Sequence, residues 1–523
     1  MALTSPKASA PAPRSAGADA DVDVAIVGYG PVGAVTAALL GQAGLRVQVC
    51  DRLPGVHEIP RAISLDHEVM RVFQQIGVVD SVRPHTEPFT DSQWFGADGQ
   101  LIRRMTMLPP PHPQGYTPSL VFTQPPVEQA LRERVARLPD VRVDLGTTLT
   151  GLDQDDAGVT LTLQSTAGAV STLRARWVVA CDGGSSSVRP MVGVELDDLD
   201  FDEPWLVVDV LVGPEGLARL PVTSVQFCEP ERPSTMVIGP GNHRRWEISL
   251  KPGEDPREAA TEAGTWALLS RWLEPSQGRL WRQASYRFHA LVARRWRAGR
   301  VFLAGDAAHM QPPFLGQGMC QGVRDAANLA WKLAAVLRGE VRGAAAETLL
   351  DSYGQERQGH VRELTGRLKQ LGAIICERDP VKARARDARL LAECGGVVRD
   401  TPRQDVLPRL QSGLLAARDT TGRGTLFPQP RLADGRLMDE QHGHGWRLVL
   451  TGGLQAPAAT PDLGVIALAT GPARELDGVV AAWMLRHDCQ AALLRPDHYV
   501  YGTASTAPEL QALLAERAAA LGH

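Results

Sequence analysis

A turn rich in glycine and proline separates an apolar, strand-like run at 301–304 from a helical segment at 319–338. An acid at a strand end can accept hydrogen bonds from hydroxyl groups, and paired prolines form a stiff wall without N–H donors. Glycines allow close backbone approach, and the N-terminus of the following helix aims free N–H groups and partial positive charge at a ligand. This chemistry suits the ribityl chain and pyrimidine edge of a flavin, where the reduced ring carries negative charge. The residues are Gly305, Asp306, Pro312, Pro313, Gly316, Gly318 and Met319.

A second glycine cluster, Gly28-x-Gly30-Pro31-x-Gly33, lies between an apolar run at 22–27 and a helical segment at 31–43. The first glycine permits a tight turn, the second lets the backbone approach a pyrophosphate, and the third lets the helix pack on the strand. Asp51 ends the next strand-like run, 45–50, where a carboxylate can accept the ribose hydroxyls of an adenosine, and Arg52 follows it. The pattern predicts a βαβ unit that binds the ADP half of a dinucleotide.

A third pair, Asp182-Gly183, closes an apolar run at 176–181 and is followed by Ser185 and Arg189. Alone, Asp-Gly is typical of a polar β-turn. Beside the other two motifs, it favours a cofactor contact. The three together indicate FAD rather than NAD alone.

The elements that position these motifs follow from the hydrophobic pattern. We expect helices at 65–77, 124–138 and 345–371, an irregular stretch at 81–118, and further strands at 141–145 and 159–163. Strand-length pieces at 205–212, 235–239 and 245–250 indicate an antiparallel sheet inserted into the dinucleotide-binding fold. Strands at 446–451 and 464–468 and a helix at 508–520 predict a third, α/β domain. The predicted divisions are a disordered tail (1–20), a discontinuous FAD-binding domain (21–80, 116–199 and 293–395), a substrate-binding sheet (81–115 and 200–292) and the third domain (396–523).

Composition excludes several classes of protein. A net charge of −4 argues against nucleic acid or an anionic membrane as the main partner, and no apolar run is long enough to span a bilayer. The seven cysteines form no C-x-x-C pair, which favours reduced thiols in a cytoplasmic protein over a disulfide framework or a metal site.

The three motifs resemble the signatures of the single-component FAD-dependent aromatic hydroxylases, and so does the run from Asp325 to Leu333. Four further stretches resemble the branch that contains 3-(3-hydroxyphenyl)propionate hydroxylase and phenol hydroxylase. The resemblance implies an α/β fold: a Rossmann-like FAD-binding domain like that of para-hydroxybenzoate hydroxylase, an inserted antiparallel substrate sheet and a C-terminal thioredoxin-like domain without redox cysteines. The four stretches are Pro60-Arg61-Ala62-Ile63, Pro84-His85-Thr86-x-Pro88, Val207-Val208-Asp209 and Arg495-Pro496-Asp497.

The resemblance also implies a reaction. NADH or NADPH reduces FAD, O2 forms a flavin C4a-hydroperoxide, and one oxygen is transferred ortho or para to the hydroxyl of a small phenolic substrate such as 3-hydroxyphenylpropionate. A tailoring hydroxylase of a larger phenolic or hydroxypyridine natural product shares every motif. A flavin-binding scaffold without turnover is disfavoured by the complete ribityl and pyrimidine-edge motif. A homodimer through the third domain is also expected.

Relatives of this kind place residues equivalent to Arg61 and Gln124 near the flavin, although a surface salt bridge and a helix N-cap are alternative roles. Tyr286, 20 residues before Asp306, corresponds to a tyrosine that contacts the substrate hydroxyl, while a core tyrosine is equally compatible with the sequence. His289 and Pro313 are the other catalytic candidates. Cys320 stands where many members have Asn.

Overall fold

A mainly parallel sheet forms the base of the dinucleotide-binding unit in the computed structural model, which describes residues 20–468 and 473–523. All of the predicted tail except Ala20 lies outside these ranges. Neighbouring strands from β18 to β8 are parallel, and β9 (Thr147–Gln154) and β10 (Val159–Ser165) extend antiparallel from β11. The order is β17 (Arg297–Ala298), β18 (Val301–Leu303), β11 (Val170–Ala180), β1 (Val22–Val27), β2 (Val47–Asp51) and β8 (Val141–Leu145).

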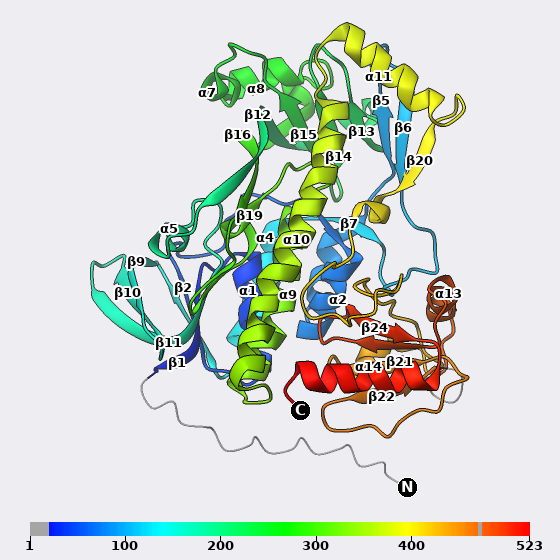
Figure 1. Cartoon of the computed structure of the whole chain (residues 1–523). Helices are drawn as coiled ribbons and strands as arrows, with labels where there is room; N and C mark the ends of the chain where they lie inside the picture. The colour runs from blue at the N-terminus through cyan, green and yellow to red at the C-terminus, as the bar shows by residue number, and fades with distance from the viewer. Residues whose placement is uncertain (1–19, 469–472) are drawn as a thin grey trace.

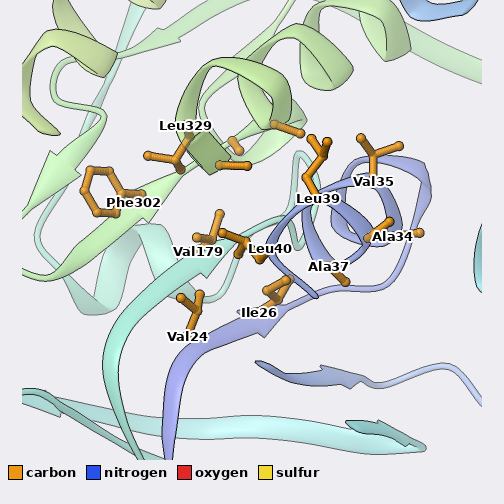
Figure 2. Packing of buried hydrophobic residues seen from close by; sticks show 14 of the residues in the cluster. Val24, Ile26, Ala34, Val35, Ala37, Leu39, Leu40, Val179, Phe302 and Leu329 are labelled. Atoms are coloured by element: carbon orange, nitrogen blue, oxygen red, sulfur yellow. The ribbon is translucent and has the colours of Figure 1, made fainter. Parts of the chain in front are cut away.

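Helix α1 (Pro31–Gln42) is small and apolar on all sides, and every residue from Gly33 to Gly41 is buried. An all-apolar helix must be covered on every face. Accordingly, α1 lies between the sheet and two further helices, α4 (Gln124–Ala136) and α9 (Gly318–Leu337). Figure 2 shows Leu39 and Leu40 of α1 directed toward Val179 of β11 and Leu329 of α9. This packing fixes the glycine turn at the start of α1.

The second sheet has nine strands and stands above the first (Figure 1). It includes β5 (Ser92–Phe95) and β6 (Leu101–Thr106), so the prediction of an irregular stretch at 81–118 was wrong. These short strands pair with partners far away in the sequence: β5 lies parallel to β13 and β6 parallel to β20. The remaining pairs are antiparallel, as predicted. The other strands are β19 (His309–Met310), β16 (Gly278–Ala293), β12 (Leu196–Val212), β15 (His243–Ser249), β14 (Ser234–Ile238), β13 (Ser224–Phe227) and β20 (Arg399–Pro402).

The predicted helix at 65–77 is divided into a strand and a helix. Residues 64–66 form β3 (Ser64–Asp66), which pairs with β7 (Ser119–Phe122), itself paired with β4 (Thr86–Pro88). Asp66 then caps α2 (His67–Ile76) by accepting a hydrogen bond from the Val69 N–H at 3.1 Å.

A C-terminal unit, from residue 410 onward, contains a four-stranded sheet in the order β22 (Gly464–Ala467), β21 (Arg447–Leu450), β23 (Ala491–Leu494) and β24 (Val500–Ala504). Strands β22 and β21 are parallel and the other two pairs antiparallel, which is the arrangement of a thioredoxin-like sheet. β20, which lies inside the predicted third domain, pairs instead with the nine-stranded sheet, so that sheet extends beyond residue 396.

Helix α10 (Gly343–Ile375) runs through the centre of the molecule, from the parallel sheet to the nine-stranded sheet (Figure 1). At 1.5 Å per residue, its 33 residues span about 50 Å. Across the described ranges, no helix combines the length and apolarity needed to cross a bilayer. The other helices are α3 (Val79–Val82), α5 (Val188–Met191), α6 (Pro214–Arg219), α7 (Pro256–Ala259), α8 (Glu262–Leu269), α11 (Pro380–Ala392), α12 (Met438–His442), α13 (Val479–Arg486) and α14 (Ala507–Ala520). The 3-10 turns are η1 (Arg83–His85), η2 (Pro275–Gln277), η3 (Gly305–Ala307) and η4 (Arg403–Val406).

Candidate flavin and substrate site

The turn between β1 and α1 has no room for a side chain at two of its glycines but has free space at the third. Gly28 has φ +99°, and a Cβ there would lie 2.4 Å from the carbonyl oxygen of Cys181. A Cβ on Gly33 would lie 2.0 Å from the Gly28 oxygen, whereas a Cβ on Gly30 would meet no atom within 4 Å. The turn therefore needs the outer glycines for its own packing, and Gly30 borders free space.

Asp51, at the end of β2, braces this turn. Its carboxylate accepts hydrogen bonds from the N–H groups of Tyr29 at 2.5 Å and Leu53 at 2.7 Å. The neighbouring Arg52 is exposed.

Arg132 of α4 supports the same turn from the other side and was not predicted. It donates to the Tyr29 carbonyl at 2.7 Å, lies 4.6 Å from the centre of the Tyr29 ring, and pairs with Glu128 at 2.8 Å. Its spacing of four residues from Glu128 on one helix was a signal in the sequence.

The Asp182-Gly183 loop is tied to the Gly305 turn. One carboxylate oxygen of Asp182 accepts hydrogen bonds from the N–H groups of Ser187 at 2.7 Å and Val188 at 3.1 Å. The other, Oδ1, is buried without a partner among the described residues. Arg189 donates to the carbonyls of Gly184 and Ala307, both at 3.0 Å. In this structure Arg189 therefore links two of the predicted motifs.

The Gly305 turn is held by Asp325, a residue of α9. Its carboxylate accepts the Gly305 N–H at 2.9 Å, is 2.8 Å from His309 Nε2, and accepts from Arg357 Nε at 2.8 Å. Asp306 beside it is accessible to solvent. Burial raises the pKa of Asp306, and the positive charges of His309 and Arg61 partly oppose that rise.

The loop before α9 ends with free backbone donors. Gly316 has φ +59°, and its N–H donates to the Pro313 carbonyl at 2.6 Å. The first intrahelical bond runs from Gln321 to Gln317 at 2.9 Å, so the N–H groups of residues 318–320 have no helical acceptor. A Cβ on Gly318 would meet no atom within 4 Å. The start of α9 therefore offers unpaired backbone N–H groups next to free space.

Cys320 points away from this edge. Its thiol is fully buried and lies 3.8 Å from the Ser64 carbonyl of β3. The cysteine therefore packs between α9 and β3, and Met319, at the start of the helix, packs against the same core.

These features fit a dinucleotide cofactor. Gly30, Asp182 and Asp306 follow β1, β11 and β18, so they lie at the carboxyl ends of neighbouring parallel strands, where open α/β sheets bind such ligands. Open space at Gly30 and Gly318, the unpartnered Asp182 oxygen and the accessible Asp306 carboxylate are all available to an elongated ligand.

Gln124 acts on the segment that carries Arg61. Its side-chain oxygen accepts the N–H groups of Arg61 at 2.9 Å and Ala62 at 2.7 Å. The Arg61 side chain is exposed and close enough to Asp306 to influence its pKa. The predicted flavin contacts of both residues stay predictions.

Tyr286 lies on the face of the nine-stranded sheet that meets the segment at residues 60–61. Its hydroxyl accepts a hydrogen bond from Arg282 at 2.5 Å, and the side chain is 41% exposed. Arg282 also donates to the Pro60 carbonyl at 2.7 Å, and Arg245 donates to the Arg61 carbonyl at 2.8 Å. Tyr286 is thus oriented by an arginine that also joins the sheet to the dinucleotide-binding unit.

Asp209 holds both arginines in place. It pairs with Arg245 at 2.7 Å and with Arg282 at 3.6 Å, and it lies 2.7 Å from His243 Nε2. Burial alone would raise the pKa of Asp209, but Arg245 and His243 lower it to about 2. The sequence offered one signal for this group: a carboxylate within the apolar run of β12.

His289 is not brought beside Tyr286. Side chains alternate along β16, so residues 286 and 289 project from opposite faces of the sheet. His289 lies 3.7 Å from Asp202 instead.

Asp439, His444 and His498 gather their ligand-type atoms within 4.8 Å of one another. Guanidinium groups already occupy both oxygens of Asp439: Arg71 at 2.6 Å and Arg447 at 2.5 Å. Two adjacent positive charges disfavour a metal cation, so this cluster is an ion-pair network.

Three comparisons relate these features to known proteins. A family model described as FAD binding domain matches residues 21–367. A probable NADH-specific resorcinol 4-hydroxylase of Rhodococcus jostii (strain RHA1) is 37% identical over 518 residues, 95% of this chain and 94% of that protein. A 3-(3-hydroxy-phenyl)propionate/3-hydroxycinnamic acid hydroxylase of Comamonas testosteroni is 35% identical over 455 residues, 83% of this chain and 75% of that protein.

Solved structures share the fold. The flavin-dependent monooxygenase PieE, in complex with FAD and substrate, has a TM-score of 0.78 at 21% identity, covering 98% of this chain and 100% of that one. Aklavinone-11 hydroxylase with FAD and aklavinone has a TM-score of 0.76 at 23% identity, and the match covers 97% of this chain and 100% of that one. These likenesses confirm the predicted fold class.

Proposed function

The chain belongs to the family of single-component FAD-dependent aromatic hydroxylases, and we propose that its substrate is a small monocyclic phenol. The protein is an FAD-dependent monooxygenase that uses a nicotinamide cofactor and O2 to hydroxylate a phenolic ring. The substrate proposal rests on the hydrogen bond between Arg282 and Tyr286. Arg282 also bonds the Pro60 carbonyl, so the Tyr286 hydroxyl lies beside the dinucleotide-binding unit. The names of the two relatives, matched over most of this chain, support a single ring.

We assign the cofactor to the carboxyl ends of β1, β11 and β18. Gly28, Gly30 and Gly33 would hold the pyrophosphate and Asp51 the ribose of the adenosine. Asp306 would hold the ribityl chain, and the free N–H groups at the start of α9 the pyrimidine edge. When bound, FAD supplies the activation of O2 with electrons from the nicotinamide. The remaining proposed contacts are Pro31, Arg52, Arg61, Gln124, Asp182, Arg189, Gly305, Pro313, Gly316, Gly318 and Met319.

The side chains on the sheet act on the substrate. Because the Tyr286 hydroxyl accepts its hydrogen bond from Arg282, its own proton is free to be donated to a phenolic oxygen. A phenol held in this way loses its proton more readily, and a phenolate is the better nucleophile for hydroxylation. The Pro313 loop and the buried sheet face exclude water from the reacting ring.

Two substrate types fit this proposal: a dihydroxybenzene such as resorcinol, and a 3-hydroxyphenyl alkanoic acid such as 3-(3-hydroxyphenyl)propionate. The test is the oxidation of NADH and of NADPH by purified protein of known FAD content, with and without each phenol, followed by identification of the product. We expect a hydroxylated ring at the position ortho or para to a hydroxyl. If no phenol yields a hydroxylated product, the proposal is wrong.

We also propose that the protein works in the cytoplasm as a homodimer. The free state of the seven cysteines supports a reducing compartment. Leu485 of α13, 83% exposed, is an apolar side chain that a contact between C-terminal units would cover. Light scattering of the holoenzyme measures its oligomeric state.

A further inference from the structure

One face of the nine-stranded sheet contacts the dinucleotide-binding unit at two places. Phe314, which follows the Pro312-Pro313 pair, packs edge-on against Trp205 of β12, with ring centres 6.1 Å apart. Four residues away on each strand, at the level of Asp209, Arg245 and Arg282 bond the carbonyls of residues 60–61. Both contacts involve the segments that carry the proposed flavin site.

A single row of side chains lies between these contacts. Val207 of β12 is opposite Glu247 on β15 and Ala284 on β16, and side chains two residues apart project from the same face. Tyr286 belongs to the neighbouring row, opposite Trp205. A substrate ring held by Tyr286 therefore lies over or beside Val207, Glu247 and Ala284.

Glu247 is a buried acid whose neighbours are already engaged. It is 8% exposed and makes no hydrogen bond or ion pair with any residue in the described ranges. The adjacent Arg245 is engaged with Asp209, and the Thr235 hydroxyl donates to Gln226 at 2.5 Å. Its carboxyl oxygens are not among the fully enclosed side-chain atoms without a partner, so they reach accessible space where a ligand hydroxyl group can bond them.

The charged surroundings leave Glu247 able to accept a hydrogen bond near neutral pH. Burial raises the pKa of this carboxyl to about 7; Arg245 and Arg282 lower it, and Asp209 raises it further. The carboxyl group is therefore poised between its charged and neutral forms.

We propose that Glu247 accepts a hydrogen bond from a second hydroxyl group of the substrate while Tyr286 holds the first, so that the substrate is a neutral dihydroxybenzene. The inference rests on the proposed function and narrows it. Neighbouring strands are about 4.8 Å apart, so β15 and β16, on either side of β12, are separated by about 10 Å. One ring with hydroxyl groups at two positions, each with a hydrogen bond of about 2.7 Å, can bridge such a gap.

The same face disfavours a substrate with an acidic side chain. Its two arginines, Arg245 and Arg282, are already paired with Asp209 and with backbone carbonyls. A substrate carboxylate in this row would face Glu247, and neither Arg245 nor Arg282 is free to pair with it; an unpaired like charge is an effective element of discrimination.

The test compares kcat/KM for resorcinol, phenol and 3-(3-hydroxyphenyl)propionate in the FAD-loaded enzyme. We expect the wild type to prefer resorcinol. In Glu247→Gln we expect kcat/KM for resorcinol to fall roughly 10-fold, because a neutral amide oxygen accepts a weaker hydrogen bond than a carboxylate does, while phenol changes little. The affinity for resorcinol, followed by perturbation of the flavin absorbance, should weaken in parallel. Glu231→Gln, an exposed acid of the same unit paired with Lys251, is the matched control.

The ratio of resorcinol to phenol within one preparation separates recognition from loss of folding. An equal fall for all three compounds, an unchanged ratio, or a wild-type preference for the propionate overturns the role of Glu247 and leaves the hydroxylase proposal intact. A wild-type enzyme that hydroxylates none of them overturns the proposed function itself.

Discussion

At the scale of single residues, the candidate site is built largely from side chains that position other groups. Asp51 and Gln124 accept backbone N–H groups, and Arg189 bonds two carbonyls. Tyr286 differs because its hydroxyl accepts from Arg282 and keeps its own proton available on an exposed side chain. It is therefore the residue for which a chemical role can be tested most directly.

We expect Tyr286→Phe to lower kcat/KM for a phenolic substrate by about 100-fold or more, because the substrate oxygen loses its proton donor. FAD content and the unfolding midpoint should not change, since the ring stays in place. Steady-state kinetics and flavin absorbance measure these effects. Tyr116→Phe removes a hydroxyl that donates to Gln74 at 2.8 Å outside the proposed site and serves as the control. Equal losses in both variants would contradict a specific role for Tyr286.

The sequence predicted the glycines and acids of the cofactor motifs because each carries a local requirement: a left-handed backbone, a close approach or a strand-end acceptor. It singled out Asp209 only as part of a family-like stretch, and it did not predict the roles of Arg282, Asp209 or Glu247, which contact or face one another only because three strands pair side by side. Gln124 illustrates the same limit: its partners, the N–H groups of residues 61 and 62, are more than 60 positions away.

At the scale of elements, long segments with strong periodicity were predicted well and short ones were not. The predicted strand at 22–27 matches β1, and helices α1, α4, α9, α10 and α14 lie close to their predicted bounds. Strands β5 and β6 were missed because they are short and owe their stability to β13 and β20, which lie far from them in the sequence. Local pattern could not reveal that pairing.

The junction of β1 and α1 provides a test at this scale. Gly33→Ala should destabilise the protein even without FAD, because the added Cβ would lie 2.0 Å from the Gly28 carbonyl oxygen. Gly30→Ala should leave the apoprotein stable, since no atom lies within 4 Å, and should weaken FAD binding at least 10-fold by filling the space proposed for the pyrophosphate. Urea unfolding of apoprotein and FAD titration distinguish the two. A Gly30→Ala variant with unchanged FAD affinity would contradict the proposed position of the pyrophosphate.

At the scale of the whole molecule, buried ion pairs join the C-terminal unit to the rest. Asp439 pairs with Arg71 of α2, and Arg495 pairs with Glu356 of α10 at 2.6 Å. Lys332 of α9 also pairs with Glu356, at 2.8 Å, which explains part of the family-like run from Asp325 to Leu333. A cavity of about 850 Å³, lined by residues that include Arg324 and Trp483, lies at the same boundary. Apolar residues of α9 and α10 also pack there against the C-terminal unit, so ion pairs and apolar packing share the contact.

We expect Asp439→Asn to destabilise the protein by about 3 to 5 kcal/mol, because two buried arginines would lose their counter-charge. Asp419→Asn, in an exposed pair with Arg423 of the same unit, should cost less than about 1 kcal/mol. Chemical denaturation of the FAD-loaded enzyme measures both. If Asp439→Asn destabilised the protein as little as Asp419→Asn, the buried ion pairs of Asp439 would not be what holds the C-terminal unit in place.

The pH dependence of stability follows from the same buried groups. Burial lowers the pKa of His67 and His444 to about 4 from 6.5, and the pKa values of His360 and His498 fall in the same direction. Between pH 6.5 and 4 the unfolded chain therefore binds protons that the folded chain does not, so stability must fall as the pH falls. Each unit by which a pKa differs between the folded and the unfolded chain changes the free energy of unfolding by about 1.4 kcal/mol.

Glu247 opposes this trend. Its folded pKa, about 7, lies above the ordinary 4.5, so the folded chain takes up its proton first and gains stability from it as the pH falls from 7 to 4.5. Glu247→Gln removes that contribution, and we expect the variant to lose stability more steeply than the wild type over this range. Urea unfolding at pH 7, 6 and 5, with Glu231→Gln as the control, measures the two slopes. A slope in Glu247→Gln equal to or gentler than that of the wild type would mean that the Glu247 carboxyl group is not held in the buried, partly protonated state on which its proposed contact with the substrate depends.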